Sequence, residues 1–233
     1  MLSTNLPVIY EDDDLIVINK PSGLRVIADG YHPEYPSVRS LLTAQMGRIY
    51  IVHRLDKDTS GILLVAKNAQ AHKLLNSQFE KHQIQKIYYA IVISPIPFPP
   101  LIKINQPLKV NGDRRHRTIV QTNFGKPALT EFFLIEQFQS VALVTALPKS
   151  GYTHQIRAHA LAAGYPLLGD DLYQFPSSSH IANLDLPPFL RPALHAYQIS
   201  FIHPRSMQNL TFTCPLPIDF ENYLNYLRNK PEN

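Results

Sequence analysis

The spacing of apolar residues predicts a chain made mostly of short strands with a few helices. VIYEDDDLIVINK has two apolar runs on either side of an acidic turn, which predicts two short strands that end at Lys20. The run from Ile62 to Ala66 predicts a buried strand. KIYYAIVIS, residues 86–94, places Tyr88 and Tyr89 on opposite faces of another strand. Further strands are predicted at residues 118–122, 128–137, 141–147 and 193–202.

Helical spacing of apolar residues is confined to a few segments. One helix is predicted over residues 37–46 with Ser37 as its N-cap, and a second from Asn68 to about His82. Two more are predicted at 153–163 and 220–228. Because strands follow one another with few helices between them, the pattern favours an α+β fold around a mainly antiparallel, mixed β-sheet with flanking helices and loops. No linker divides the chain, so one domain is expected over residues 1–233, with a core at about 8–215.

Composition narrows the classes of protein. The 233 residues are 45% hydrophobic and 17% charged, which is enough apolar surface for a globular core. The net charge of +4 permits an anionic partner without demanding one. A single cysteine, Cys214, excludes an internal disulfide and a cysteine-rich zinc site. Without a signal-peptide pattern or a long apolar run, the chain is expected to be soluble and cytoplasmic, with no membrane partner.

The stretch HRLDKDTSG places Asp56 between a basic pair and a polar turn. Taken alone, it is more typical of a turn-capping aspartate than of a catalyst. A catalytic role requires a positive partner that keeps a partly desolvated carboxylate ionised. GYTHQIRAHA, residues 151–160, offers Arg157, with His154 a turn away, although an exposed helix arginine is the simpler interpretation.

Other chemistry is weakly supported or excluded. The spacing of His154 and His159 does not place them on one helix face, and no HExxH motif occurs, so no metal site is expected. A G-x-S-x-G elbow for a serine nucleophile is also missing. The basic run KVNGDRRHR, residues 109–117, is either a solvated surface or a loop that contacts phosphates. The strand tyrosines either stack on a base or pack in the core.

Five sequence blocks, taken together and in order, indicate a family that no single block identifies. The blocks are VIYEDDDLIVINKPSGL, HRLDKDTSGILLVAKN, KIYYAIV, GYTHQIRAHALAAGYPLLGDDLY and LHAYQISFIHP. They resemble, in order, the N-K-P-x-G opening, the H-R-L-D-x-x-T-S-G signature, the K-x-Y-x-A-x-V strand, the G-R-x-H-Q-I-R-x-H segment with its G-D-x-x-Y end, and the L-H-A strand of one enzyme family. That family is the RNA pseudouridine synthases of the RluA type, and the resemblance runs from about Val8 to Pro215.

The resemblance implies an isomerase that needs no cofactor and acts on a flipped-out uridine of an rRNA or tRNA stem-loop. Asp56 corresponds to the essential carboxylate, Arg157 to the arginine that pairs with it, and Tyr88 to the tyrosine that packs on the target base. Whether Asp56 attacks C1′, attacks the base or removes a sugar proton stays open. The other residues expected to contact the substrate are Lys20, His53, Arg54, Thr59, Ile62, Leu63, Arg114, Arg115, Arg117, His154 and Gln155.

Two departures and two alternatives accompany this interpretation. Tyr152 stands where the family usually has arginine, which alters one expected RNA contact. The chain starts at the catalytic domain, so no S4-type RNA-binding domain is expected, nor a protein partner, and a monomer is predicted. One alternative is a catalytically inactive RNA-binding protein on the same fold. The other is a carboxylate hydrolase, which would need a second acid such as Asp58 near Asp56.

Overall fold

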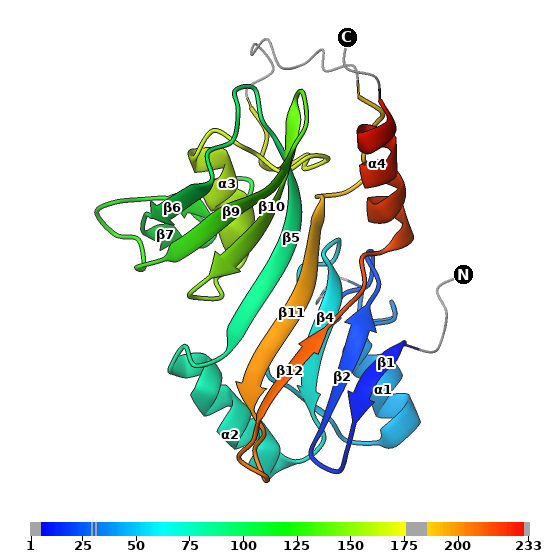
Figure 1. The fold of residues 1–233 in the computed structure, drawn as a ribbon. Coiled ribbons are helices and arrows are strands. Elements are labelled where there is room, and N and C mark those ends of the chain that lie inside the picture. The colour runs from blue at the N-terminus through cyan, green and yellow to red at the C-terminus, as the bar shows by residue number, and fades with distance from the viewer. Residues whose placement is uncertain (1–5, 29, 31, 176–185, 231–233) are drawn as a thin grey trace. The chain divides into compact units, whose positions relative to one another are not determined.

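The computed structural model describes residues 6–28, 30, 32–175 and 186–230. The chain forms two compact units (Figure 1). Unit 1 consists of residues 1–86 and 195–216, and unit 2 of residues 87–194 and 217–233. The chain therefore leaves unit 1 within one strand and returns to it within another, and each unit is described by itself.

Unit 1 is built on a mixed sheet. Its strands are β1 (Val8–Glu11), β2 (Leu15–Lys20), β3 (Tyr50–Ile51), β4 (Ser60–Ala66), β11 (Leu194–Ile202, from His195 on) and β12 (Asn209–Thr213). The order is β1-β2-β4-β11-β12, with β3 beside β4. All pairs are antiparallel except β4 and β11, which run parallel. The apolar runs of β2 and β4 are buried, as expected for central strands.

Both helices of unit 1 begin at the residues that the sequence indicates. α1 (Val38–Met46) has Ser37 as its N-cap, in a reciprocal capping box with Ser40. α2 (Ala69–Glu80) has Asn68, whose side chain accepts the Ala71 N–H at 2.9 Å. Since α2 packs on β3 and β4, it covers the strand that follows the HRLDKDTSG loop (Figure 1).

Unit 2 combines an antiparallel sheet with a small hairpin. The sheet has the order β5 (Gln85–Ile93, from Ile87 on), β10 (Val141–Pro148), β9 (Leu129–Gln137) and β6 (Leu101–Asn105). The hairpin pairs β7 (Leu108–Lys109) with β8 (Ile119–Val120). Helix α3 (Gln155–Ala162) packs against β8, β9 and β10, and α4 (Ile218–Asn229) ends the unit (Figure 1).

Helix α3 differs from its predicted form. Every side chain from Gln155 to Ala160 is buried, including those of Arg157 and His159. The helix begins later than predicted, after His154, whose φ of 56° is left-handed. The simpler interpretation of Arg157 as an exposed helix arginine is excluded, since Arg157 is only 8% exposed.

The α+β prediction with a mixed, mostly antiparallel sheet is confirmed. Short strands β3, β6, β7 and β12 were not predicted, and the strand expected at 118–122 is only β8. The prediction of one catalytic domain over residues 1–233 stays a prediction. Within the described residues, none of the helices is long and apolar enough to cross a membrane.

Candidate active site

The HRLDKDTSG loop leads from β3 into β4 and carries Asp56 at a turn. The Thr59 N–H donates to the Asp56 carbonyl at 3.2 Å, and Thr59 itself is buried. Asp56 is partly buried, whereas Arg54 is exposed to solvent. The turn therefore holds the Asp56 backbone directly before a rigid central strand.

A second loop, Lys20 to Leu24, clasps this turn. The Lys20 side chain is fully buried, and its ammonium donates to the carbonyls of Pro21 and Leu24, each at 2.8 Å, and of Lys57 at 3.0 Å. The Gly23 N–H also donates to the Lys57 carbonyl, and the Ser22 hydroxyl donates to that of Asp58 at 2.9 Å. The N-K-P-S-G motif thus braces the Asp56 turn. Lys20 has this structural role, and its predicted substrate contact stays a prediction.

His53 fastens the start of the loop to β4. Its Nε2 accepts the Leu64 N–H at 3.0 Å, and its ring stacks on Phe79 of α2 with the centroids 4.9 Å apart. Burial and the nearby Lys86 charge lower the pKa of His53 from 6.5 to about 3. Because protonation of Nε2 would break the bond to Leu64, the neutral ring is the one that supports the loop.

A pH dependence of stability follows from His53. The folded state disfavours the protonated ring. The contribution of neutral His53 to the free energy of unfolding is therefore complete above pH 6.5 and is lost as the pH falls toward 3. Between pH 6.5 and 5 we expect His53 to lower the free energy of unfolding by up to about 1.4 kcal/mol per pH unit. In His53→Gln an amide oxygen accepts from Leu64 without titrating, so urea unfolding should show a flatter pH profile.

Exposed His82 supplies the control for this measurement. His82→Gln should keep the wild-type dependence of unfolding free energy on pH. An unchanged slope in His53→Gln would show that the ring does not titrate with the fold.

Gly61 and Ser60 join the loop to the other end of the chain. In the parallel pair of β4 and β11, Ser60 lies opposite His195 and Gly61 opposite Ala196. The Ser60 hydroxyl lies 2.9 Å from His195 Nδ1, and His195 Nε2 lies 3.3 Å from the Cys214 carbonyl. Since a carbonyl only accepts, Nε2 carries the proton and Nδ1 accepts from Ser60. The T-S-G and L-H-A motifs therefore contact each other and together hold β4 beside β11.

Ile62 and Leu63 are buried at 2% and 0% exposure within β4. They pair with Asn19 and Ile18 of β2. Both side chains belong to the core of unit 1, and their predicted contact with the target base stays a prediction.

In unit 2 the buried side chain of Arg157 forms a two-pronged ion pair with Asp170. Its Nε donates to Asp170 Oδ2 at 2.6 Å and its NH2 to Oδ1 at 2.7 Å. The guanidinium carbon lies 4.8 Å from the centroid of the Tyr173 ring. The predicted pair of Arg157 with Asp56 joins residues of different units and stays a prediction.

His154 and Gln155 have mainly structural contacts. His154 Nδ1 lies 3.1 Å from the Tyr173 hydroxyl. The Gln155 Oε1 accepts from the Ser150 hydroxyl and the Tyr152 N–H, while Nε2 donates to the Leu129 carbonyl and the Thr130 hydroxyl. Because both ends of this buried amide are engaged, the structure favours Gln155 as a brace between the loop before α3 and β9.

The basic loop between β7 and β8 presents its arginines unequally. Arg114 and Arg115 are exposed. Arg117 is partly buried: its Nε donates to Asp113 Oδ2 at 2.6 Å and its NH1 to the Leu172 carbonyl at 3.2 Å. Arg117 therefore shapes the loop. Arg114 and Arg115 are better placed for a polyanion because both are exposed, although Arg115 also donates to the Asp171 carbonyl at 3.4 Å.

Tyr88 is 9% exposed and lies opposite Ala146 in the pairing of β5 with β10. The neighbouring Tyr89 is partly exposed and lies opposite Thr145. The strand prediction that separates the two rings onto opposite faces is confirmed, and base packing by Tyr88 stays a prediction.

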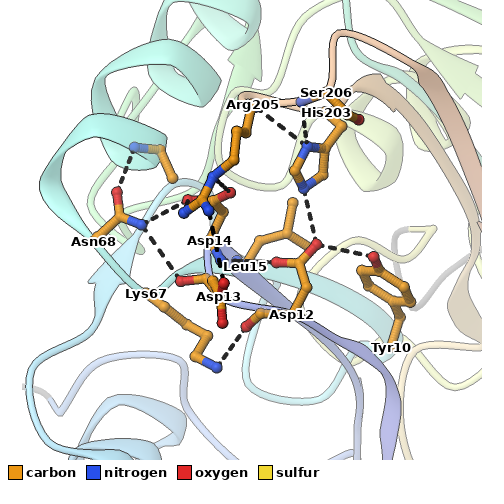
Figure 2. Close-up of polar contacts among 11 residues, drawn as sticks. Tyr10, Asp12, Asp13, Asp14, Leu15, Lys67, Asn68, His203, Arg205 and Ser206 are labelled. Carbon is orange, nitrogen blue, oxygen red and sulfur yellow. Dashed lines mark hydrogen bonds and ion pairs between the residues drawn. The ribbon is translucent and has the colours of Figure 1, made fainter.

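Among the described residues, Asp12, Asp14 and His203 form one group whose ligand atoms lie within 4.8 Å of one another. Figure 2 shows that protein groups already engage these atoms. Asp12 accepts from Tyr10, His203 and two backbone N–H groups, and Asp14 pairs with Arg205. His203 Nδ1 accepts backbone N–H groups, so its Nε2 carries a proton. The cluster is saturated as a hydrogen-bond network, and the expectation of a metal-free protein stays a prediction.

Several residues of these arrangements were not singled out from the sequence. Ser60, Gly61, Asp170, Tyr173 and His195 stood in the quoted motifs without a role. The signal that could have found them is their presence in those motifs beside residues with assigned chemistry. The contacts of Ser60 with His195 and of Tyr173 with Thr118 join segments that are distant in sequence, so spacing does not predict them.

Comparison with known proteins shows to which family the chain is similar. The family model of RNA pseudouridylate synthase matches residues 14–162. An uncharacterised RNA pseudouridine synthase of Synechocystis is 38% identical over 99% of this chain and 72% of its own length. Ribosomal large subunit pseudouridine synthase D of Nitrosomonas europaea is 37% identical over 98% and 67%, and synthase C of Vibrio cholerae 38% over 95% and 69%.

Solved structures support the same fold. Human RNA pseudouridylate synthase domain containing 4 superposes with a TM-score of 0.76 at 24% identity, covering 97% of this chain and 95% of that one. Human RNA pseudouridylate synthase domain containing 1 gives 0.74 at 24% identity, with 99% and 98% covered. With the family match over more than half of the chain, the RluA-type resemblance is confirmed: the chain belongs to the RNA pseudouridylate synthase family, whose members are isomerases that convert uridine in RNA to pseudouridine.

Proposed function

We propose that this enzyme isomerises specific uridines of structured rRNA or tRNA and that Asp56 is its essential carboxylate. The observation that carries the proposal is the clasp around the Asp56 turn, in which a buried lysine, a serine hydroxyl and a glycine N–H hold adjacent carbonyls. Such bracing holds the backbone next to the Asp56 carboxylate, and a reaction at a single base requires a catalytic group held in place.

The proposed reaction conserves every atom of the nucleotide. The bond between N1 of uracil and C1′ breaks, the base turns, and C5 bonds to C1′. The proton on C5 leaves, and N1 ends protonated. A target that is unpaired or in a loop costs least to flip into the site. Arg157 is proposed to pair with Asp56, and Tyr88 to pack on the target base.

The relatives suggest which RNA to test first. Those from Nitrosomonas and Vibrio are named as large-subunit ribosomal enzymes, so we propose large-subunit rRNA as the substrate to test before tRNA. We further propose that the enzyme acts as a monomer in the cytoplasm without a protein partner.

Release of tritium from C5 of uridine tests the function. Purified protein is incubated with 5-tritiated transcripts of large-subunit rRNA and with tritiated tRNA. Release of tritium to water from either RNA is the expected result, followed by mapping of the modified uridines. Binding without release from any RNA would contradict the proposal and favour the inactive RNA-binding alternative.

The basic loop gives a prediction on salt. Arg114→Gln with Arg115→Gln should weaken RNA binding and reduce the slope of log K against log salt by roughly 1 to 2, because each phosphate contact contributes roughly 0.7 to 0.9. Arg117 is kept so that its bond to Asp113 preserves the loop. Affinity is measured by filter binding at several salt concentrations.

The control is Arg228→Gln, which makes the same Arg→Gln change once, at an arginine that already pairs with Glu136. Its salt slope should match that of the wild type. If the double variant also keeps the wild-type slope, the loop does not contact phosphates.

A further inference from the structure

The segment GDDLY, residues 169–173, contains the partner of Arg157. The Asp170 side chain is fully buried and receives four N–H bonds. Two come from the Arg157 guanidinium, and two from the backbone of Leu172 and Tyr173 at 3.0 and 2.9 Å. A buried carboxylate that accepts this many N–H groups is fixed in orientation.

The guanidinium of Arg157 is thereby held on two sides. Its Nε and NH2 face Asp170, and the Tyr173 ring lies 4.8 Å from its central carbon. These contacts fix both the plane and the rotation of the group, so the remaining edge points in one direction. An arginine without such contacts could rotate about its side-chain bonds, and its guanidinium would not have one fixed orientation.

The support itself is anchored within unit 2. At Gly169, where φ is 71°, an added Cβ would lie 3.0 Å from the Phe189 carbonyl carbon, so the backbone here is in close contact with a neighbouring segment. The Thr118 N–H donates to the Tyr173 hydroxyl at 2.7 Å. Burial raises the pKa of Tyr173 to about 12, so its hydroxyl stays protonated. The segment is therefore a rigid base for Arg157.

The same segment receives the basic loop. Arg117 NH1 donates to the Leu172 carbonyl at 3.2 Å, and Arg115 NH2 to that of Asp171 at 3.4 Å. Thus the loop proposed to bind RNA and the arginine proposed to act beside Asp56 rest on one short piece of backbone.

From this arrangement we infer that Asp170 is a positioning residue for the isomerisation and acts by holding the Arg157 guanidinium in the direction that the reaction needs. The inference rests on the proposed function. Asp170 does not act as a substrate ligand in this proposal, because its four hydrogen bonds connect it to groups of the protein.

The first test compares Asp170→Asn with Asp171→Asn, the same change at the next residue, whose side chain is exposed. In tritium release, Asp170→Asn should lower kcat by about 100-fold or more while KM for RNA changes less than about 3-fold, as expected for a misplaced catalytic group. Asp171→Asn should keep both constants. Unchanged kcat in Asp170→Asn would overturn the inference.

A double-mutant cycle with Arg157→Lys separates positioning from general loss of structure. If Asp170 acts through Arg157, Asp170→Asn should lower kcat by less than about 3-fold once Arg157 is lysine. Equal fold losses in the two backgrounds would overturn the inference. Should Asp170→Asn fail to fold, Asp170→Glu keeps the charge and displaces the carboxylate, with a loss of kcat again expected and an unchanged kcat again contradicting the role.

The wild type distinguishes the two proposals. Wild-type protein that releases no tritium from any RNA removes the proposed function. Active wild type together with an Asp170→Asn variant of normal kcat removes the positioning role alone.

Discussion

Replacing Asp56 by asparagine is expected to lower tritium release from 5-tritiated RNA by about 10⁴-fold or more. Asparagine has nearly the shape of aspartate but carries no charge, so it neither attacks carbon nor accepts a proton. RNA affinity should change little, because the turn around residue 56 is held by backbone groups of Lys57 and Asp58. The rate is measured under single-turnover conditions with enzyme in excess.

The matched control for Asp56→Asn is Asp58→Asn in the same loop. It makes the same change of charge and keeps the carbonyl that accepts from Ser22. We expect its rate to stay within about 10-fold of the wild type. A loss of equal size in both variants would instead indicate a pair of acids, as a carboxylate hydrolase needs. Full activity in Asp56→Asn would refute the essential role of Asp56.

Gly61→Ala is expected to destabilise the fold by about 4 kcal/mol or more, which lowers the melting temperature by roughly 10 °C. The new Cβ would lie 2.7 Å from the Ala196 backbone nitrogen and 2.8 Å from its carbonyl carbon. These are strand atoms of β11 that cannot move without breaking the parallel pair. The φ of 110° at Gly61 adds strain for any residue with a side chain.

Gly47→Ala separates the two causes of this loss. Gly47 has a φ of 78°, but nothing lies within 4 Å of an added Cβ. It should therefore show the conformational cost alone, about 1 kcal/mol. Thermal and urea unfolding measure both variants. Equal losses at the two glycines would mean that β4 and β11 do not approach closely at Gly61.

Sequence patterns predicted the elements that have strong local signals. Ser37 and Asn68 are N-caps because their side chains satisfy helix N–H groups close by in the chain. Strand β6 was not predicted because its alternating run is short and follows a proline-rich stretch. The burial of Arg157 and His159 in α3 was not predicted, because their partners Asp170 and Gln106 lie outside the helix.

For the candidate site, the motifs located Asp56, Arg157 and the basic loop, but not the contacts that hold them. Lys20 was expected at RNA, yet its ammonium is bonded to three carbonyls. No local pattern distinguishes a lysine that braces a loop from one that binds phosphate, because the carbonyls belong to two separate loops. Asp170, the partner of Arg157 within its own unit, lies in the same motif block, but the turn after α3 that brings the two side chains together leaves no periodic pattern in the sequence.

The parallel pairing of β4 with β11 also bears on the order of synthesis. Ser60 emerges from the ribosome long before His195, so the strand that follows the Asp56 turn has an unpaired edge while unit 2 is being made. Closing so long a loop is slow, and an exposed strand edge invites wrong pairing. A nascent chain that stops before His195 therefore lacks the partner of Gly61 and the anchor of Ser60. The turn that carries Asp56 is completed only when the last segment of unit 1 has been translated.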